Sequence, residues 1–240
     1  MKKATFITYI VFIHLIAGAI IVKSDILPKT MSFLGIQRHG DVASTVFYKK
    51  TLNYQLAADD NVPEGAVIFI GNSITQGMST AAVAPFTVNY GIGGDTASGV
   101  LKRLPYYHSL NRARAIVVSI GLNDLLLDGQ DYVQDNLAKI AKALPAQVPV
   151  IFSAILPVDE DVDKRLTGLN GRIVQVNKYL FKLCAADSHL YYLDARSGLI
   201  DARGNLDDRF HRGDGVHLNT KGYAILIGKM QEAVAGMQRG

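Results

Sequence analysis

The chain has 240 residues, of which 49% are hydrophobic and 19% charged, with only 7 prolines, a composition that excludes a largely disordered protein. The formal net charge is +4, but Lys2, Lys3 and Lys23 contribute +3 of it, and residues 1–24 contain no acidic side chain. The rest of the chain is therefore nearly neutral, and no run of Lys or Arg indicates a nucleic-acid partner.

An apolar run from residue 4 to residue 22 follows two lysines at the start of the chain. As a helix this run spans about 28 Å, close to the ~30 Å hydrocarbon core of a bilayer. We therefore expect residues 1–24 to be a signal anchor that binds the membrane and exports the rest of the chain. A cleavable signal peptide is the alternative, because Ala17-Gly18-Ala19 has a small-x-small pattern. Both interpretations predict a functional domain on the periplasmic or extracellular face.

Residues 25–41 show no sustained periodicity and are predicted to be a linker, which leaves residues 42–240 for the functional domain. Short apolar runs predict strands at 66–70, 86–90, 115–120, 148–155 and 190–194. Amphipathic runs predict helices at 42–58, 97–104, 131–144, 170–186 and 220–236. The strands lack polar alternation, which is typical of strands covered on both faces. We predict an α/β fold, a three-layer doubly wound sandwich with a central, mainly parallel five-stranded sheet, preceded by one N-terminal apolar helix.

Cys184 is the only cysteine, so the chain can form neither an internal disulfide nor a Cys-rich zinc site. The residues around Cys184 show the pattern of the apolar face of a helix. We therefore expect a buried, unreactive thiol at this position.

Two unusual segments follow the first two predicted strands, at the sheet edge where ligands of parallel sheets bind. Ser73 lies at a strand-to-helix turn, where its hydroxyl would be exposed, although a helix N-cap is the ordinary role of such a serine. Residues 89–96 contain three glycines, which can present backbone N–H groups to a ligand. The spacing of these glycines does not match a dinucleotide-binding motif.

Two further segments follow later in the chain. Asn123 ends the third strand and could stabilise an oxyanion with its N–H donors, or form an Asx turn. Asp214 precedes His217 by three residues, so its carboxylate could fix the imidazole tautomer and leave the other nitrogen as a base. A surface turn is the alternative, and composition does not separate His217 from His211. Together the four segments supply a nucleophile, oxyanion donors and an acid–base pair, in order.

This set resembles the SGNH/GDSL hydrolase family, and "VIFIGNSITQG" and "DGVHLNTKGY" are most similar to its lysophospholipase-like and PAF-acetylhydrolase-like esterases. The resemblance runs from about residue 48 to residue 223 and implies a flavodoxin-like fold. It implies that Ser73 is the nucleophile and that His217 is the base, oriented by Asp214. The N–H groups of Ser73 and Gly94 and the side chain of Asn123 would then form the oxyanion hole. The family often has Asp before the serine, where this chain has Asn72; that residue is not a triad member, so catalysis should not depend on it.

The resemblance implies hydrolysis of a carboxylic ester of a carbohydrate, lipid or small molecule, through an acyl-serine intermediate. It implies no metal and no organic cofactor. Little sequence separates the motifs, which leaves no room for a large lid and favours a short acyl chain. Two alternatives stay open: a cell-envelope O-acyltransferase using the same triad, and a non-catalytic glycan- or lipid-binding module on the same fold.

Overall fold

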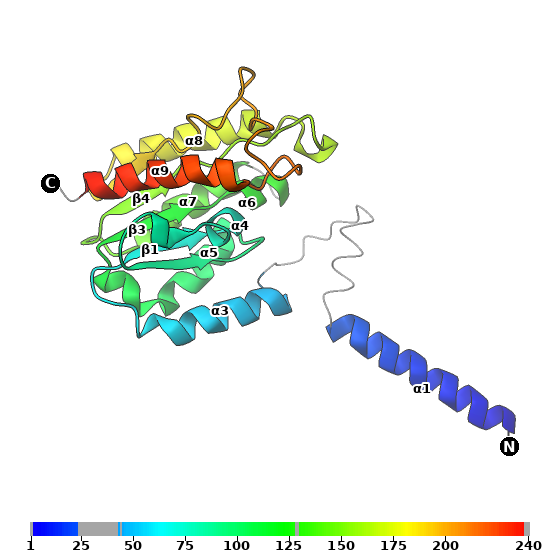
Figure 1. Cartoon of the computed structure of the whole chain (residues 1–240). Coiled ribbons are helices and arrows are strands. Elements are labelled where there is room, and N and C mark those ends of the chain that lie inside the picture. Colours follow the sequence, from blue (N-terminus) through cyan, green and yellow to red (C-terminus); the bar gives the residue numbers. More distant parts are fainter. Residues whose placement is uncertain (1, 24–42, 44, 128–129, 238–240) are drawn as a thin grey trace. The chain divides into compact units, whose positions relative to one another are not determined.

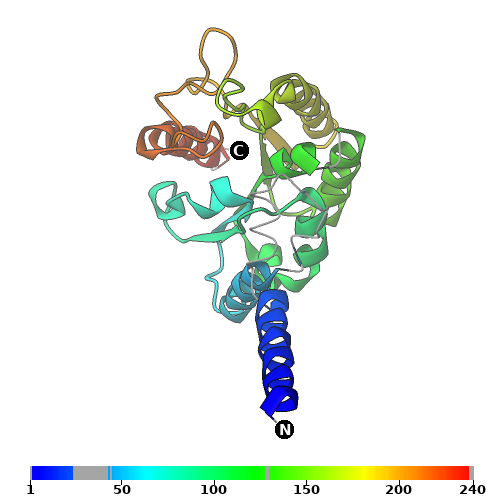
Figure 2. The same ribbon diagram turned by 90° about the vertical axis from the view of Figure 1, so that its right-hand side faces the viewer.

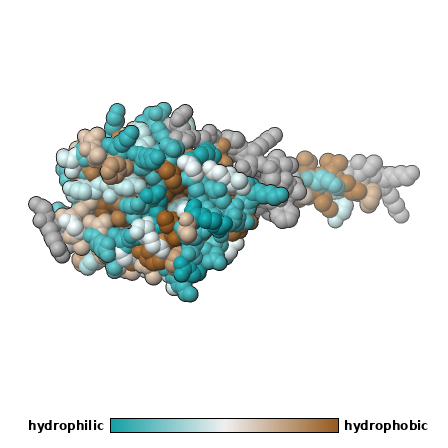
Figure 3. Space-filling model, turned by 90° about the horizontal axis from the view of Figure 1, so that it is seen from above, coloured by the Kyte–Doolittle hydropathy of each residue, from teal (hydrophilic) through white to brown (hydrophobic). Residues whose placement is uncertain are grey.

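The computed structural model describes residues 2–23, 43, 45–127 and 130–237, and the chain divides into two compact units, residues 1–50 and residues 51–240. The helix expected at the start of the chain is present as α1 (Lys2–Lys23). Its apolar side chains include the exposed Phe6, Phe12 and Leu15, and brown patches mark its surface in Figure 3. The predicted linker at residues 25–41 lies outside the described residues.

The membrane-anchor prediction for residues 4–22 finds no support in the structure. Within the described residues, no helix combines the length and the apolar character needed to cross a bilayer.

A five-stranded parallel sheet forms the centre of the second unit (Figures 1 and 2). Its strands are β1 (Val67–Gly71), β2 (Thr87–Gly91), β3 (Ala115–Ser119), β4 (Val150–Ser153) and β5 (Leu190–Leu193). They lie in the order β2-β1-β3-β4-β5, and every neighbouring pair is parallel. The chain therefore starts near one side of the sheet and winds outward in both directions, which confirms the predicted doubly wound topology.

Helices cover both faces of this sheet. The main helices of this unit are α3 (Val46–Asp59), which belongs to it from Thr51 onward, α5 (Ala97–Arg103), α7 (Gln130–Ala143), α8 (Leu169–Ala185) and α9 (Thr220–Gly236). One core cluster joins Ile68, Ile116 and Val150 to apolar residues of α5, α7 and α8. A second joins Phe69 and Val117 to apolar residues of α9. Alternate residues of β1, β3 and β4 thus point into different cores, which explains why these three strands lack polar alternation.

The fourth strand is shorter than predicted, because an asparagine takes over the backbone hydrogen bonds beyond it. The apolar run 148–155 predicts one strand, but β4 covers only Val150–Ser153. Asn177 of α8 accepts a hydrogen bond from the Ile155 N–H and donates one to the Ile155 carbonyl, both at 2.9 Å. Ile155 is therefore held in place outside the sheet ladder, with its backbone fully paired.

Cys184 is buried on α8, as predicted, and burial raises the pKa of its thiol to about 12. A thiol that stays protonated at neutral pH is a poor nucleophile. Two short helices follow strands: α4 (Ser73–Gln76) after β1, where the strand-to-helix turn was expected, and α6 (Leu122–Leu127) after β3, which was not among the predicted helices.

Candidate active site

Ser73 lies where β1 turns sharply into α4. It is the first residue of that helix, while the side chain of Asn72 accepts a hydrogen bond from the Ile74 N–H at 3.0 Å and is the N-cap. The capping role that was the alternative for Ser73 is thus filled by Asn72. The helix lies close against the sheet, since a Cβ atom at Gly71 would collide with the Thr75 side chain. The Ser73 hydroxyl is therefore free for another partner at the carboxyl edge of the sheet.

That partner is His217, which lies in the loop before α9. Ser73 Oγ is 3.0 Å from His217 Nε2, and His217 Nδ1 is 2.7 Å from Asp214 Oδ2. The other carboxylate oxygen of Asp214 accepts the backbone N–H groups of Val216 and His217, at 3.0 and 2.8 Å. The three side chains predicted as a triad thus form one continuous chain of hydrogen bonds. The His217 and Asp214 side chains are 40% and 49% exposed, so the site opens to solvent.

The environment of Asp214 favours its ionised form. Partial burial raises the pKa of Asp214, but the backbone N–H groups of His217 and Val216 and the His217 ring together lower it by more, so the pKa lies below its ordinary value. An ionised carboxylate only accepts hydrogen bonds, so it selects the tautomer with a proton on His217 Nδ1. In that tautomer Nε2 carries a lone pair facing the Ser73 hydroxyl, which is the arrangement of a general base.

The three groups predicted for an oxyanion hole lie at neighbouring strand exits. Ser73 opens α4, so its N–H has no acceptor within the helix. Gly94 has φ +78° at the third position of a turn closed by the Asp95 N–H and the Ile92 carbonyl at 3.1 Å. Such a conformation favours glycine. Asn123, on α6, donates one amide hydrogen to the Asp95 carbonyl at 2.8 Å, which leaves the second for a ligand.

The choice between Gly93 and Gly94 as the backbone donor follows from a neighbouring glutamine. The Gly93 N–H donates to Gln76 Oε1 at 2.9 Å. Within the described chain no residue accepts the Gly94 N–H. Of the two glycines, Gly94 is therefore the one whose N–H stays available to a ligand. Gln76, by contrast, carried no signal in the sequence.

A small pocket of about 20 Å³ lies among residues adjacent to these groups. Its lining residues are Asn72, Ile74, Ser119, Ile120, Leu122, Ile155, Leu156 and Val216. These include both chain neighbours of Ser73 and one neighbour each of Asn123 and His217. A volume of this size holds one or two groups as large as a water molecule or a methyl, since a single water needs about 10–15 Å³.

A larger cavity lies elsewhere in the domain. It measures about 700 Å³ and lies beside α8 and β5, where Lys178, Phe181, Lys182 and Tyr192 are among its lining residues. It contains none of the predicted site residues. The small pocket, by contrast, is lined by chain neighbours of Ser73, Asn123 and His217.

Sequence reasoning missed the buried polar residues that support the site. Arg103 of α5 is fully buried and donates hydrogen bonds to the carbonyls of Tyr90 and Gly71 and to the Asp95 carboxylate. Asp124 accepts the Ala97 N–H and so holds the start of α5. The burial of Arg103 could have been predicted from the sequence. Arg103 follows the buried Val100 by three residues and so lies on the inner face of its helix.

One group of metal-ligand residues occurs in the part of the chain that the structure describes, Asp59, Asp60 and His108. The Asp59 carboxylate already accepts hydrogen bonds from the Tyr90 hydroxyl and from Ser109. This carboxylate therefore serves as an internal acceptor that ties α3 to β2, and the group lies apart from the predicted triad.

Comparison with known proteins identifies the family. A family model described as the GDSL-like lipase/acylhydrolase family matches residues 69–225, which include all five predicted site residues. Subunit alpha1 of human platelet-activating factor acetylhydrolase IB is 26% identical over 185 residues, covering 72% of this chain and 77% of the relative. The bovine alpha2 subunit is 26% identical over 192 residues, covering 75% of this chain and 80% of the relative.

Solved structures share the fold. A GDSL-like lipase from Bacteroides thetaiotaomicron has a TM-score of 0.65 at 23% identity, covering 78% of this chain and 98% of that one. An acetylxylan esterase from Geobacillus stearothermophilus has a TM-score of 0.57 at 17% identity, covering 71% and 95%. The resemblance seen in the sequence motifs is thereby confirmed. The chain belongs to the GDSL-like lipase/acylhydrolase family and is a serine ester hydrolase of the SGNH type.

Proposed function

We propose that this protein hydrolyses short-chain carboxylic esters through an acyl-Ser73 intermediate. The observation that carries the proposal is the chain of hydrogen bonds from Ser73 Oγ to His217 Nε2, at 3.0 Å, and from His217 Nδ1 to Asp214, at 2.7 Å. Both distances lie within the range needed for proton transfer and for orienting a base.

In the first half of the reaction, His217 Nε2 takes the proton of the Ser73 hydroxyl as Oγ attacks the acyl carbonyl carbon. The carbonyl oxygen gains negative charge, which the N–H groups of Ser73 and Gly94 and the side chain of Asn123 stabilise. One such donor typically lowers the barrier by about 3–4 kcal/mol. The tetrahedral intermediate then expels the alcohol, which takes the proton from His217 Nε2, and an acyl-serine remains.

In the second half, a water molecule takes the place of the alcohol. His217 Nε2 removes one proton from the water as its oxygen attacks the acyl carbonyl. The same donors stabilise the second oxyanion, and Ser73 leaves with the proton returned by His217. The carboxylic acid departs and the enzyme is restored, with Asp214 ionised throughout.

The pocket beside the triad supports an acetyl group as the acyl part. Its volume of about 20 Å³ accepts a methyl but not an extended chain, and the buried Ile155 and Leu156 line it. Two proteins similar to this chain, an acetylhydrolase and an acetylxylan esterase, are also named for acetyl esters. The half-exposed His217 and Asp214 leave the opposite side open, which suits a bulky alcohol such as a carbohydrate or a lipid.

Hydrolysis of p-nitrophenyl acetate, butyrate and octanoate by the wild type and by Ser73→Ala tests the proposal. We expect the wild type to prefer acetate and the variant to lose turnover while keeping its circular dichroism spectrum. A variant that retains hydrolysis would remove Ser73 from its role. Products formed with and without a glycan acceptor separate hydrolysis from acyl transfer, and labelling by a fluorophosphonate separates both from a non-catalytic binding module.

We also propose that the domain is exported. Two lysines followed by a helix with exposed apolar side chains support this, as such segments direct proteins to the export machinery. Fusion of alkaline phosphatase to the carboxyl terminus, which is active only after export, tests it: an inactive fusion with an intact chain would contradict export.

A further inference from the structure

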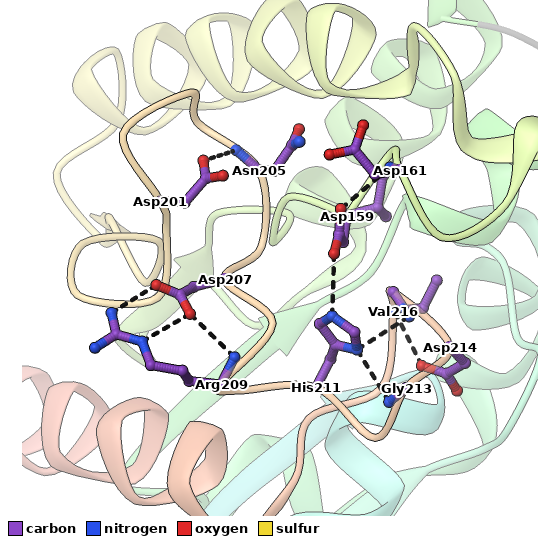
Figure 4. A network of polar contacts seen from close by, with 12 residues as sticks. Asp159, Asp161, Asp201, Asn205, Asp207, Arg209, His211, Gly213, Asp214 and Val216 are labelled. Carbon is purple, nitrogen blue, oxygen red and sulfur yellow. Dashed lines mark hydrogen bonds and ion pairs between the residues drawn. The ribbon is translucent and has the colours of Figure 1, made fainter.

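Two histidines of the loop before α9 have different surroundings. The side chain of His217 is 40% exposed and faces Ser73, whereas that of His211 is 5% exposed. The His211 ring lies between Asp159, in the segment after β4, and the turn that carries Asp214 (Figure 4). The reaction described above does not use His211, so its burial needs another explanation.

The hydrogen bonds of His211 fix its tautomer. The backbone N–H groups of Gly213 and Gly215 donate to His211 Nδ1, at 3.0 and 3.3 Å. A backbone N–H can only donate, so Nδ1 must offer a lone pair. The proton of the neutral ring is therefore on Nε2, which donates to Asp159 Oδ2 at 3.2 Å.

The two glycines held by His211 lie on either side of Asp214. Both have positive φ, +92° at Gly213 and +73° at Gly215. The Asp159 backbone N–H donates to the Gly215 carbonyl at 2.8 Å, and a Cβ atom at Gly215 would lie within 2.8 Å of the Asp159 carbonyl oxygen. The turn is thus clamped from one side by His211 and from the other by the backbone of Asp159.

The base of the same loop is closed separately. The Arg212 N–H donates to the His217 carbonyl at 2.8 Å, and the Asn219 side chain donates to the His211 carbonyl at 3.0 Å. These bonds hold the two ends of the loop together, but they do not reach its tip. The position of the Asp214 carboxylate therefore depends on the bonds at Gly213 and Gly215, together with the bonds that the carboxylate itself accepts from the Val216 and His217 N–H groups.

We propose that His211 is a positioning residue of this hydrolase: its unprotonated Nδ1 holds the amides on both sides of Asp214 and so keeps that carboxylate on His217 Nδ1. The proposal rests on the proposed roles of Ser73, Asp214 and His217. Without the acceptor, the N–H groups of Gly213 and of the buried Gly215 lose their partner and the turn shifts. A displacement of ~1 Å near a catalytic group can cost about 100-fold in rate.

Two substitutions of His211 test the contributions of its two ring nitrogens separately. In His211→Asn the side-chain oxygen stands near the position of Nδ1, so the acceptor for both amides is kept while the contact to Asp159 is lost. In His211→Gln the longer side chain reaches Asp159 but leaves the Nδ1 position without an acceptor. We expect His211→Gln to lower kcat about 10–100-fold with KM nearly unchanged, and His211→Asn to keep kcat within about threefold.

The rate of Ser73 labelling by a fluorophosphonate should follow kcat in both variants, because labelling needs the same base. The unfolding midpoint of each variant is measured as well, and assays are run where each is fully folded by circular dichroism. His189→Gln and His189→Asn are the matched controls. His189 Nδ1 lies 2.6 Å from Asp187 before β5, away from the turn, so we expect neither control to change kcat.

The outcomes separate this proposal from the one on which it rests. Wild type that is not labelled at Ser73 overturns the proposed function. Wild type that is labelled, with equal kcat in His211→Asn and His211→Gln or with wild-type kcat in the Gln variant, overturns the positioning role alone. If His211→Gln does not fold, His211→Asn decides: kept turnover supports the proposal, and a loss of more than about tenfold overturns it.

Discussion

Arg103 Nε lies 2.9 Å from Asp95 Oδ2, and both side chains are only 1% exposed. The same guanidinium donates to the Tyr90 carbonyl at 2.8 Å and to the Gly71 carbonyl at 3.2 Å. Gly71 ends the strand before Ser73, and Asp95 follows Gly94. One buried cation therefore joins the backbone that carries the nucleophile to the turn that carries an oxyanion donor.

Replacing Arg103 by Met should destabilise the domain strongly. The substitution leaves the Asp95 carboxylate buried without its cation, and removal of one partner of a buried ion pair typically costs about 3–5 kcal/mol. Urea unfolding measures the change in the free energy of unfolding. Arg165→Met is the control, because the pair between Arg165 and Asp163 is largely exposed and such pairs contribute about 1 kcal/mol or less. Equal losses in the two variants would show that Arg103 does not hold the two segments together.

Asn123→Ala should lower kcat about 100–1,000-fold with little change in KM, the usual loss when one oxyanion donor is removed. The effect falls on kcat because the second amide hydrogen of Asn123 contacts the substrate oxygen mainly once it becomes charged. Steady-state kinetics with p-nitrophenyl acetate measure both constants. Asn136→Ala, which removes a buried asparagine of α7 outside the site, should leave kcat unchanged. A rise in KM alone would assign Asn123 to ground-state binding.

Ile155→Ala should shift the acyl preference toward longer chains. Asn177 fixes the Ile155 backbone, so the lost side-chain volume is expected to remain as extra space in the pocket. Pocket contacts to one methylene discriminate by about 10–200-fold, which sets the scale of the expected rise in the butyrate-to-acetate ratio of kcat/KM. Ile151→Ala, which removes the same side chain from the core on the other face of the sheet, should leave that ratio unchanged. The same ratio in both variants would place the acyl group elsewhere.

The sheet and the triad were predictable because each has a local signal in the sequence. Buried parallel strands such as Val67–Gly71 require an unbroken apolar run, which is visible in the sequence. Ser73 and His217, which meet in the structure, each lie in a short motif that can be recognised in the sequence. The start of α4 at Ser73 was expected, but its length of four residues was not predictable, since so short a helix is not stable by itself and depends on its contact with the sheet. His211 could not be separated from His217 either, because the difference between them is which partner each ring meets in three dimensions.

Asp214 should titrate below the ordinary pKa of an aspartate. Partial burial raises its pKa, but the amides of His217 and Val216 and the His217 ring lower it by more, so the pKa in the folded protein lies below the ordinary value of 3.8. A carboxyl with a depressed folded pKa stabilises the native state at every pH above its unfolded pKa. This contribution is lost as the pH falls through the folded pKa, so it is complete at neutral pH and declines only below about 3.8.

The chemical shift of the Asp214 carboxyl carbon, followed by ¹³C NMR and assigned with Asp214→Asn, gives this pKa directly. We expect a midpoint below 3.8 in the folded protein, and a return to the ordinary range when the same carboxyl is titrated in urea. A folded midpoint above that range would mean that burial outweighs the three hydrogen bonds. Asp214 would then be partly protonated in weak acid, and it could no longer hold the proton on His217 Nδ1 there, so hydrolysis would fail at a pH where the domain is still folded.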